Sequence, residues 1–574
     1  MTSARVPYAE LHAHTAFSFL DGANQPEELV AQAAKLELDA LAITDHDGLY
    51  GVVRFANAAR HLSLPAVIGA ELSLNQRTPT TATMDPDADH LLVLTRGPEG
   101  YHRLSRAIAS AHLATGAKGE RDYGRGVGLD PLEVLAEAAD GNWLILTGCR
   151  KGTVRRALAH QGESAARSEL ERLVSLFGKD NVAVEITDQA RPEDSRRNDA
   201  LVEIARSVGL PVVATGAVHA ATPRDGHLAD ALAAIRARAS LDAIDGWLPP
   251  HPAILRSGRD MMQRHHRHPQ AVLTAARLGL ECAFDLRLVA PNLPPYPVPE
   301  GHTEDTWLVE LTMRGARERY GPPENPRHPQ AYATIARELE LILRLNFSGY
   351  FLIVHEIVDF CRSQGILCQG RGSAANSAVC YAIGITAVDA VQHKLLFERF
   401  LSDGRSGPPD IDLDIEARRR EEVIQFVYQR YGREYAAQVA NVISYRPRSA
   451  VRDAARAFGY DVGQQDAWSK GLERWGSLRA GGPTKPWWQG ELNAPREKGV
   501  DSHDPTPPPQ TPPSARETAE IPDHVLDIAE QLLKLPRHLG IHSGGMVMCD
   551  RPVIEVCPVE WATMPGRTVL QWDK

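Results

Sequence analysis

Acidic and aliphatic residues alternate without a break over residues 410–416, and this is the stretch of the sequence best suited to chemistry. In an extended strand, successive side chains point to opposite faces. The acids would therefore share one face, and they are Asp410, Asp412, Asp414 and Glu416. Carboxylates this close repel one another unless a cation lies between them, and Mg²⁺ and Mn²⁺ prefer carboxylate oxygen. The strand is either a metal-binding strand or an edge strand whose charges prevent aggregation.

A glycine-rich turn lies upstream, between an apolar run and a run of small residues that predicts a helix. A turn that leads into a helix presents free backbone N–H groups, which suit phosphate. The turn consists of Gly370, Arg371, Gly372 and Ser373. The lysine spacing of a P-loop is absent, but the arginine offers a charged hydrogen bond to phosphate. A phosphate-binding turn followed by paired aspartates is the arrangement of two-metal nucleotidyl transfer.

Five motifs closely resemble the palm of bacterial C-family DNA polymerases, the alpha subunit of DNA polymerase III and its relatives. They are GRGSAANS, LLFERFL, PPDIDLDIE, YRPRSAVRDAARAFG and LGIHSGGMVM. The resemblance implies a nucleotidyltransferase-type palm with a helical thumb and DNA-directed DNA polymerase activity with Mg²⁺. It implies that Asp412 and Asp414 are the catalytic metal ligands, and that primer–template DNA and deoxynucleoside triphosphates (dNTPs) are bound.

The first 225 residues alternate short strand-like and helical segments, which predicts a parallel α/β sheet or barrel. Metal-type residues fall near the C-terminal ends of the expected strands, where such barrels build their sites. A single histidine is most often an ordinary core or surface residue. Repeated placement at one edge favours a metal site instead.

This segment resembles the PHP domain, a distorted α/β barrel at the front of C-family polymerases. The resemblance implies a metal site. Mixed histidine, carboxylate and thiolate ligands would suit Zn²⁺ or Mn²⁺. The candidate ligands are His12, His14, Asp21, His46, Glu71, His112, Cys149 and His219. The family's last motif, D-x-H, reads Ala217-Val218-His219 here, so one ligand position lacks its aspartate. Phosphodiesterase activity and a purely structural site both remain open.

A chain of 574 residues is too long for one core, and we expect four segments. They are a PHP barrel with connecting helices (1–290), a first palm part (291–432), a thumb (433–530) and a second palm part (531–574). Residues 477–520 are rich in proline and predict a disordered insert. Residues 433–475 are expected to be helical.

Net charge is −10, so no global basic field marks a nucleic-acid-binding protein, and local patches must do so. The thumb patch expected to contact DNA consists of Arg446, Arg448, Arg452 and Arg456. Seven cysteines without a C-x-x-C pair fit a reducing cytoplasm. No apolar run approaches the length of a membrane span.

The wording of YAELHAHTAFSFLDGANQPEELV resembles the error-prone paralogue more than the replicative alpha subunit. That resemblance implies damage-induced translesion synthesis, with the sliding clamp and mutasome proteins as partners. In the family a third catalytic aspartate lies beyond the position of Lys574, so we expect an incomplete, inactive fragment. Three alternatives stay open: the replicative subunit, a PHP-type phosphoesterase, and a non-catalytic DNA- or partner-binding module.

Overall fold

The computed structural model describes residues 5–124, 128–289, 294–402, 409, 411–472, 478, 521–533 and 535–573. Most of the proline-rich insert and Asp410 therefore lie outside the described residues. The chain divides into two compact units, each treated by itself below. The first unit is Met1–Ala290, Gln438–Gly545 and Ile554–Lys574, and the second is Pro291–Ala437 and Met546–Val553.

The first unit begins with a sheet of seven strands that pair in the order of the sequence. They are β1 (Ala9–Glu10), β2 (Ala40–Ile43), β3 (Ala66–Leu74), β4 (Asp89–Thr95), β5 (Trp143–Leu146), β6 (Val182–Thr187) and β7 (Val212–Thr215). The strands are rich in valine, isoleucine and leucine and are buried on both faces, as expected for strands covered by helices. The predicted α/β barrel of alternating strands and helices is confirmed.

The sheet is nearly closed but not wholly parallel. A parallel bridge between Ala13 and Val218 links the chain after β1 to the chain after β7. Strand β4 runs antiparallel to both of its neighbours, β3 and β5. The first residues of β4 therefore lie at the edge where the parallel strands have their last residues, and this edge carries the metal-type side chains.

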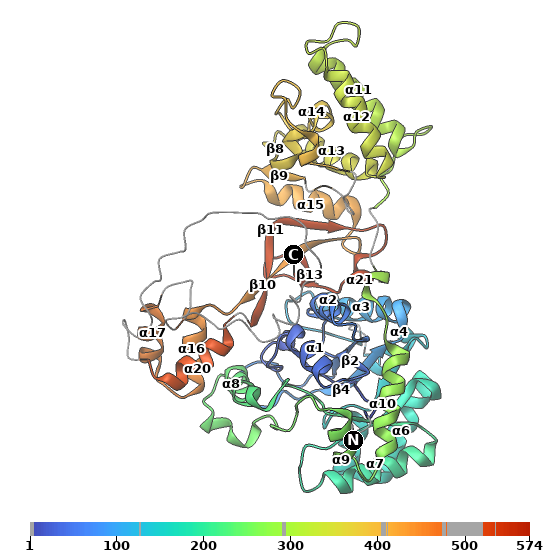
Figure 1. The fold of residues 1–574 in the computed structure, drawn as a ribbon, viewed down its shortest axis with the longest axis vertical. Coiled ribbons are helices and arrows are strands. Elements are labelled where there is room, and N and C mark those ends of the chain that lie inside the picture. The colour runs from blue at the N-terminus through green and yellow to red at the C-terminus, as the bar shows by residue number, and fades with distance from the viewer. Residues whose placement is uncertain are drawn as a thin grey trace. The chain divides into compact units, whose positions relative to one another are not determined.

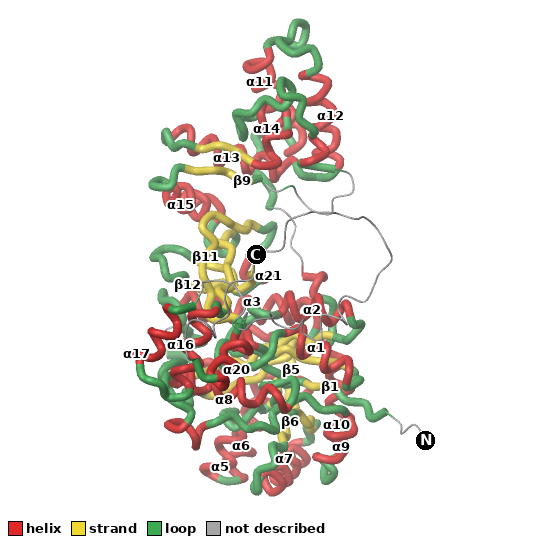
Figure 2. Tube along the Cα trace, turned by 60° about the vertical axis from the view of Figure 1, so that its left-hand side comes forward, coloured by secondary structure: helices red, strands yellow, loops and turns green. Residues whose placement is uncertain are grey.

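Helices cover the outside of the barrel (Figure 1). They are α1 (Pro26–Lys35), α2 (Val52–His61), α3 (Gly97–Ala114), α4 (Pro131–Ala139), α5 (Thr153–Gln161), α6 (Glu163–Phe177), α7 (Asp194–Val208), α8 (Gly226–Ala237), α9 (Gly258–Arg264) and α10 (Pro269–Cys282). Short 3₁₀ helices are η1 (Ala16–Ser18), η2 (Lys179–Asn181), η3 (Pro223–Asp225), η4 (Asp242–Trp247) and η5 (Leu286–Val289). Figure 2 shows the strands enclosed by these helices.

The later segments of the first unit pack onto the barrel. Helices α16 (Pro447–Ala457) and α20 (Asp523–Leu532) share a hydrophobic core with α8, and α17 (Val462–Lys470) packs on α16. A second sheet has the order β11-β10-β13-β12. Its strands are β10 (Ala436–Ser444), β11 (Pro536–Met548), β12 (Val559–Trp561) and β13 (Thr568–Asp573), and α21 (Val553–Val556) lies between β11 and β12 in the sequence. The expectation of helix throughout 433–475 was wrong for residues 436–444, because this stretch pairs with β13.

The second unit is mainly helical. It contains α11 (Glu304–Tyr320), α12 (Ala331–Arg344), α13 (Ser348–Ser363), η6 (Gly372–Asn376), α14 (Ala378–Ala382), η7 (Phe397–Arg399) and α15 (Arg420–Tyr431). Its two strands, β8 (Cys368–Arg371) and β9 (Asp412–Ile415), form an antiparallel pair. Helices α11 to α14 enclose a hydrophobic core of their own, so the strand pair is held by a rigid support.

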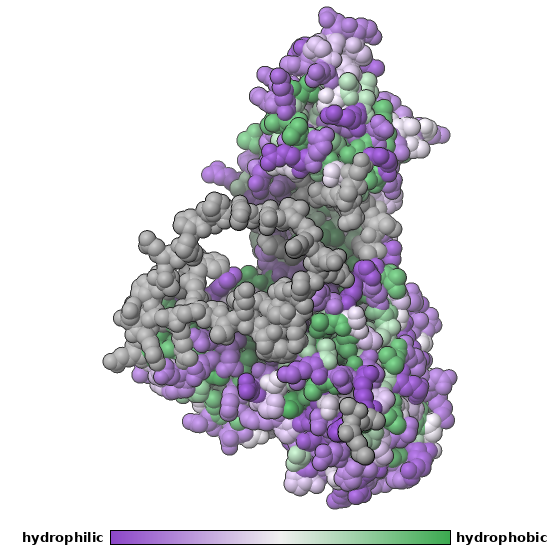
Figure 3. Space-filling model, viewed as in Figure 1, coloured by the Kyte–Doolittle hydropathy of each residue, from purple (hydrophilic) through white to green (hydrophobic). Residues whose placement is uncertain are grey.

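Hydrophilic residues cover most of the described surface on the face shown in Figure 3. Among the described residues, no single helix has both the length and the apolar character needed to span a membrane. Helices α12 and α13 reach that length and apolar character only when they are taken together, and the chain bends by 115° between them.

Candidate functional site

Five candidate metal ligands converge at one edge of the barrel. The ends of β1 and β2 and the strands β3 and β4 carry them, and they are His12, His14, His46, Glu71 and His90. Their ligand atoms form overlapping groups, within each of which the atoms lie within 4.8 Å of one another. The groups are His12–His14–Glu71, His46–Glu71–His90 and, with one further residue, His14–Asp21–His46.

Glu71 lies at the centre of this cluster. Its Oε2 is 3.5 Å from His14 Nε2, 3.4 Å from His46 Nδ1 and 3.1 Å from His90 Nδ1. Among the described residues, Glu71 Oε1 and His46 Nδ1 are buried without a hydrogen-bond partner. Such atoms cost free energy unless a cation satisfies them. The donor set of imidazoles around one carboxylate therefore fits a transition metal ion.

A buried carboxylate behind the cluster orients one of the histidines. Glu185 of β6 is fully buried, and its Oε1 lies 2.8 Å from His12 Nδ1. This contact turns His12 Nε2 toward His14 Nε2, which is 3.1 Å away. Thr215 of β7 donates a hydrogen bond to the same oxygen of Glu185. Carboxylates placed in this way fix which ring nitrogen faces a metal and raise its basicity.

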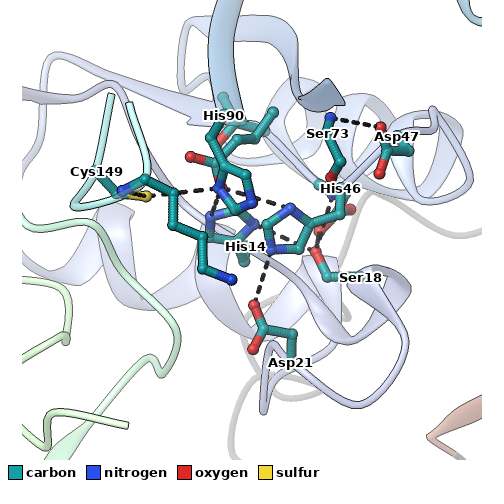
Figure 4. A network of polar contacts seen from close by, with 12 residues as sticks. His14, Ser18, Asp21, His46, Asp47, Ser73, His90 and Cys149 are labelled. Atoms are coloured by element: carbon teal, nitrogen blue, oxygen red, sulfur yellow. Dashed lines mark hydrogen bonds and ion pairs between the residues drawn. The ribbon is translucent and has the colours of Figure 1, made fainter. Parts of the chain in front are cut away.

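Asp21 joins two further histidines to the cluster. Its Oδ2 is 3.0 Å from His46 Nε2 and 3.3 Å from His219 Nε2, and Figure 4 shows it pointing toward His46. The ring of His219 lies 4.7 Å from that of His14, centroid to centroid. The other oxygen of Asp21 accepts a hydrogen bond from Arg236. The Arg236 guanidinium thus supplies positive charge at this side of the cluster.

Burial and neighbouring charges set the protonation of the cluster. Burial, followed by the charges of His46 and His219, lowers the pKa of His14 well below its usual value. Its imidazole is therefore neutral, which is the form that binds metals. Burial favours the neutral acid of Glu71, but the charge of His90 and other imidazole contacts outweigh it and hold the pKa of Glu71 well below its usual range. Glu71 is therefore ionised, which is the form in which a carboxylate can bind a metal.

Cys149 lies at the margin of the cluster, in the loop after β5. Its Sγ is 3.5 Å from His90 Nδ1, and Figure 4 shows the two side by side. Burial, followed by the charge of Glu71, raises the pKa of this thiol to about 12. The thiol is protonated at neutral pH, and a bound metal would have to displace its proton.

His112 is not brought to the cluster. It is buried on α3, with Nε2 3.3 Å from the backbone oxygen of Asp47 and 3.4 Å from Gln571 Nε2. His90 lies among the ligands instead, and sequence reasoning missed it. The rule that ligands follow parallel strands overlooks a strand that runs the other way, and His90 is the second residue of antiparallel β4.

Residues near the end of the chain hold the loop that carries His46. Gln571 Oε1 accepts a hydrogen bond from Leu49 N at 2.8 Å, and Trp572 Nε1 donates one to Leu49 O at 3.1 Å. Tyr50 donates to Glu560 Oε2 at 2.6 Å. The metal cluster therefore depends on residues more than 500 positions away, and a fragment that ends at residue 290 lacks these contacts.

The predicted palm residues lie on the strand pair β8–β9. Asp412 and Asp414 share one face of β9 and are exposed, as their alternation predicts. Arg371 pairs with Asp412 across the ladder, and its Nε lies 2.9 Å from Asp414 Oδ1. Both side chains of that ion pair are more than half exposed, so solvent screens it and it opens at little cost.

The glycine-rich turn connects this strand pair to η6. Gly372 has a φ of 64°, which favours glycine, and a Cβ at this position would lie 3.6 Å from Asp412 Oδ2. The backbone therefore passes close to the carboxylates. Gly370 and Arg371 end β8, and Gly372 and Ser373 begin η6. The structure thus brings the predicted phosphate-binding turn and the two predicted catalytic aspartates together.

Comparisons with known proteins agree with this geometry. Residues 10–189 match the PHP domain, and residues 306–574 match the bacterial DNA polymerase III alpha NTPase domain. The second match includes the glycine-rich turn, both aspartates and the arginine-bearing helix α16. The chain therefore carries two domains of C-family DNA polymerase III alpha, a PHP domain followed by an alpha NTPase domain.

Curated relatives of this chain are named error-prone DNA polymerases. That of Mycolicibacterium paratuberculosis is 57% identical over 570 residues, which are 99% of this chain and 48% of the relative. That of Nocardia farcinica is 53% identical over 99% of this chain and 50% of the relative. The chain therefore spans about half the length of the curated relatives it matches. Among solved structures, an amidohydrolase from Chromobacterium violaceum is 17% identical over 37% of this chain and 88% of its own, with a TM-score of 0.25.

The four arginines that the sequence predicted to contact DNA are largely paired within the first unit. Arg448 donates to Leu472 O at 2.8 Å, and Arg456 donates to the buried Asp453. Arg452 donates to Ser469 Oγ and forms an ion pair with the half-exposed Asp466, each at 3.0 Å. Arg446 immediately precedes α16, and its backbone N–H donates to Ser449 Oγ at 3.0 Å. The four arginines thus differ in how readily each can turn to a phosphate.

Proposed function

We propose that this chain works in DNA-directed DNA synthesis of the error-prone, translesion type, with Asp412 and Asp414 as its catalytic carboxylates. The observation that carries the proposal is the β8–β9 pair, which puts Arg371 beside two exposed aspartates on neighbouring strands. Mg²⁺ held by these carboxylates would stabilise charge at the phosphate being transferred. Arg371 would bind a nucleotide phosphate after releasing Asp414.

The proposed substrates are primer–template DNA and dNTPs. In a polypeptide of the relatives' length, the proposed partners are the sliding clamp and the proteins of a mutasome, and the proposed location is the cytoplasm. The seven cysteines are free thiols, which agrees with a reducing compartment. The proposed domains are the barrel with connecting helices (1–290), the palm (291–432 and 531–574) and the thumb (433–530), with strand β10 reassigned from the thumb to the palm.

Primer extension tests this proposal. A polypeptide extended to the relatives' length should copy a template with Mg²⁺ and dNTPs, and should also copy past an abasic site. Residues 1–574 alone should bind primer–template DNA and not extend it. Failure of the longer polypeptide to incorporate any nucleotide directed by the template would contradict the proposal. DNA binding that does not depend on Asp412, together with such failure, would favour a non-catalytic DNA-binding module.

The buried cluster around Glu71 favours a second candidate function, that of a PHP-type metal-dependent phosphoesterase. Zn²⁺ or Mn²⁺ would be held by the imidazoles and carboxylates of the cluster, and would activate water for attack on a phosphodiester. Because Ala217 stands where the family has aspartate, we propose weak or no exonuclease activity and a mainly structural metal. Removal of a mismatched primer end that is lost in His12→Ala would support the phosphoesterase.

A further inference from the structure

A buried carboxylate lies beneath the glycine-rich turn of the second unit. Glu338 of α12 is 1% exposed and accepts three hydrogen bonds from consecutive residues. Ser377 Oγ donates to Glu338 Oε2 at 2.8 Å, Val379 N donates to the same oxygen at 3.0 Å, and Ala378 N donates to Oε1 at 3.1 Å. No motif in the sequence marks this residue.

These contacts satisfy the start of α14. The first N–H groups of a helix have no partner within the helix. Glu338 binds those of Ala378 and Val379, and the Ser377 hydroxyl binds that of Cys380 at 3.1 Å. All of these residues are buried, so water cannot take the place of the carboxylate. Loss of Glu338 would leave two buried N–H groups unsatisfied.

The segment between β8 and α14 is therefore held at both ends. At its start, Gly370 N donates to Ile385 O at 2.7 Å, and a Cβ on Gly370 would meet that oxygen at 2.5 Å. At its end, Ser377 is held by Glu338. Only six residues, Arg371–Asn376, lie between these two anchors, and five of them form η6. The direction of the turn's backbone N–H groups thus depends on both anchors.

We propose that Glu338 is a positioning residue for nucleotide binding, which sets the orientation of the Gly370–Ser377 turn toward the phosphates of a dNTP. This inference rests on the proposed polymerase function of the same site. Glu338 acts through the turn and does not touch the nucleotide. Of the two anchors, only the one at Ser377 depends on the Glu338 side chain, which a single substitution can alter. The anchor at Gly370 is a hydrogen bond between backbone atoms.

The charge of Glu338 supports this role. Burial raises the pKa of Glu338 to about 7, while its three hydrogen bonds and the charge of Arg337 oppose that rise. Burying a carboxylate costs free energy, and an apolar side chain at position 338 would avoid that cost. The hydrogen bonds to the turn are the compensation that the structure offers.

The test compares Glu338→Gln with the matched control Glu340→Gln, an exposed position on the same helix. Glutamine keeps the shape of glutamate but replaces one acceptor with a donor, which opposes a buried N–H. Hydrogen exchange on residues 1–574 should be at least tenfold faster over residues 371–379 in Glu338→Gln and unchanged in the control. Affinity for dATP with Mg²⁺ should fall at least tenfold in Glu338→Gln, whereas affinity for primer–template DNA should not change.

The outcomes separate this inference from the proposed function. If the wild-type chain binds no dATP, that result counts against the proposed polymerase function. Hydrogen exchange alone then decides whether Glu338 positions the turn. Wild-type exchange over 371–379 in Glu338→Gln overturns the inference, as does dATP affinity equal to that of the control. Should Glu338→Gln fail to fold, Ser377→Ala replaces it. That variant removes one of the three bonds, and a smaller acceleration confined to the same residues is then expected.

Discussion

The barrel cluster and the palm strands both gather carboxylates, but they treat charge in opposite ways. Around Glu71, the cluster is mostly buried, and three imidazole nitrogens lie within 3.5 Å of one carboxylate oxygen. On β9, Asp412 and Asp414 face solvent, and the ion pair between Asp414 and Arg371 is exposed. The candidate ligands of the barrel all lie within the first unit and are mostly buried, whereas the two aspartates of β9 are exposed.

This difference indicates what each site requires. A buried cluster is costly to assemble and costly to open, which suits a resident metal that stabilises the fold. Exposed carboxylates cost the folded state little free energy, and they become catalytic only when cations and substrate bind to them. We therefore expect the barrel to respond to metal removal by losing stability, and the palm to respond to mutation by losing activity.

The largest effect should follow loss of a palm carboxylate. Asp412→Ala or Asp414→Ala, in a polypeptide of the relatives' length, should lower primer extension by more than about 10³-fold, because charge stabilisation at the phosphate is worth several kcal/mol. Thermal stability should not change, since both side chains are exposed. Glu318→Ala, an exposed acid on α11, is the control. Near-normal primer extension by Asp412→Ala would contradict the assignment of Asp412 as a catalytic carboxylate.

The next largest effect should be on the metal content of the barrel. Elemental analysis of the whole chain should find Zn or Mn, and Glu71→Ala should remove it, because Glu71 belongs to two of the three ligand groups. Chelation should lower the melting temperature by several degrees, since a ligand bound only to the native state at about a hundredfold excess over its Kd contributes about 2.7 kcal/mol.

The control for the barrel is His160→Ala, which lies exposed on α5 outside the cluster and should keep its metal. The whole chain is needed because Gln571 and Trp572 hold the loop of His46. Only trace metal in the gently purified wild-type chain, or full metal in Glu71→Ala, would count against a resident ion.

Much of both sites was predictable because short motifs carry their residues. The H-x-H pair after β1 and the histidine after β2 are placed by strands whose hydrophobic runs are plain in the sequence. The alternation that puts Asp412 and Asp414 on one face is equally local. In these places the period of the backbone alone sets the direction of the side chain.

What escaped prediction depends on contacts distant in sequence. His90 needed the antiparallel direction of β4, and Glu185 acts through a residue 173 positions away. Strand β10 was expected to be helical, but pairing with β13 decides its conformation. Glu338 belongs to a helix whose amphipathic pattern gives no sign that one acid faces inward.

A smaller effect on stability should come from the buried Glu338. Burial raises its pKa from 4.5 to about 7, so the folded state binds a proton more tightly than the unfolded state does. The free energy of unfolding of the second unit should therefore fall as pH rises from about 4.5 to about 7, by up to about 3 kcal/mol.

Chemical denaturation monitored across this pH range measures the slope. Glu338→Gln does not titrate and should remove this fall, while Glu340→Gln should keep it. Burial lowers the pKa of His355, so the slope that remains in Glu338→Gln should be a rise of stability with pH. The other titratable groups facing the carboxylate, Tyr320 and Cys380, have pKa values raised above this range and do not contribute. A fall of stability with pH that survives in Glu338→Gln would assign it to another group.

The smallest effect concerns DNA binding, and it separates the thumb arginines by the partners they already have. Arg452 shares its charge with Asp466, which is 43% exposed, so a DNA phosphate can replace that partner. Arg456 forms an ion pair with Asp453, whose side chain is only 3% exposed. Asp453 also faces Arg537. If Arg456 turned to a DNA phosphate, the buried carboxylate of Asp453 would lose this partner, which is costly.

Each phosphate neutralised by a protein cation releases counterions and adds about one unit to the salt dependence of binding. Arg452→Ala should therefore lower the slope of log affinity against log salt by about one unit, and Arg456→Ala by much less, in a fluorescence titration of primer–template DNA. Equal losses in the two variants would mean that the ion pairs within the thumb do not decide which arginines reach the DNA.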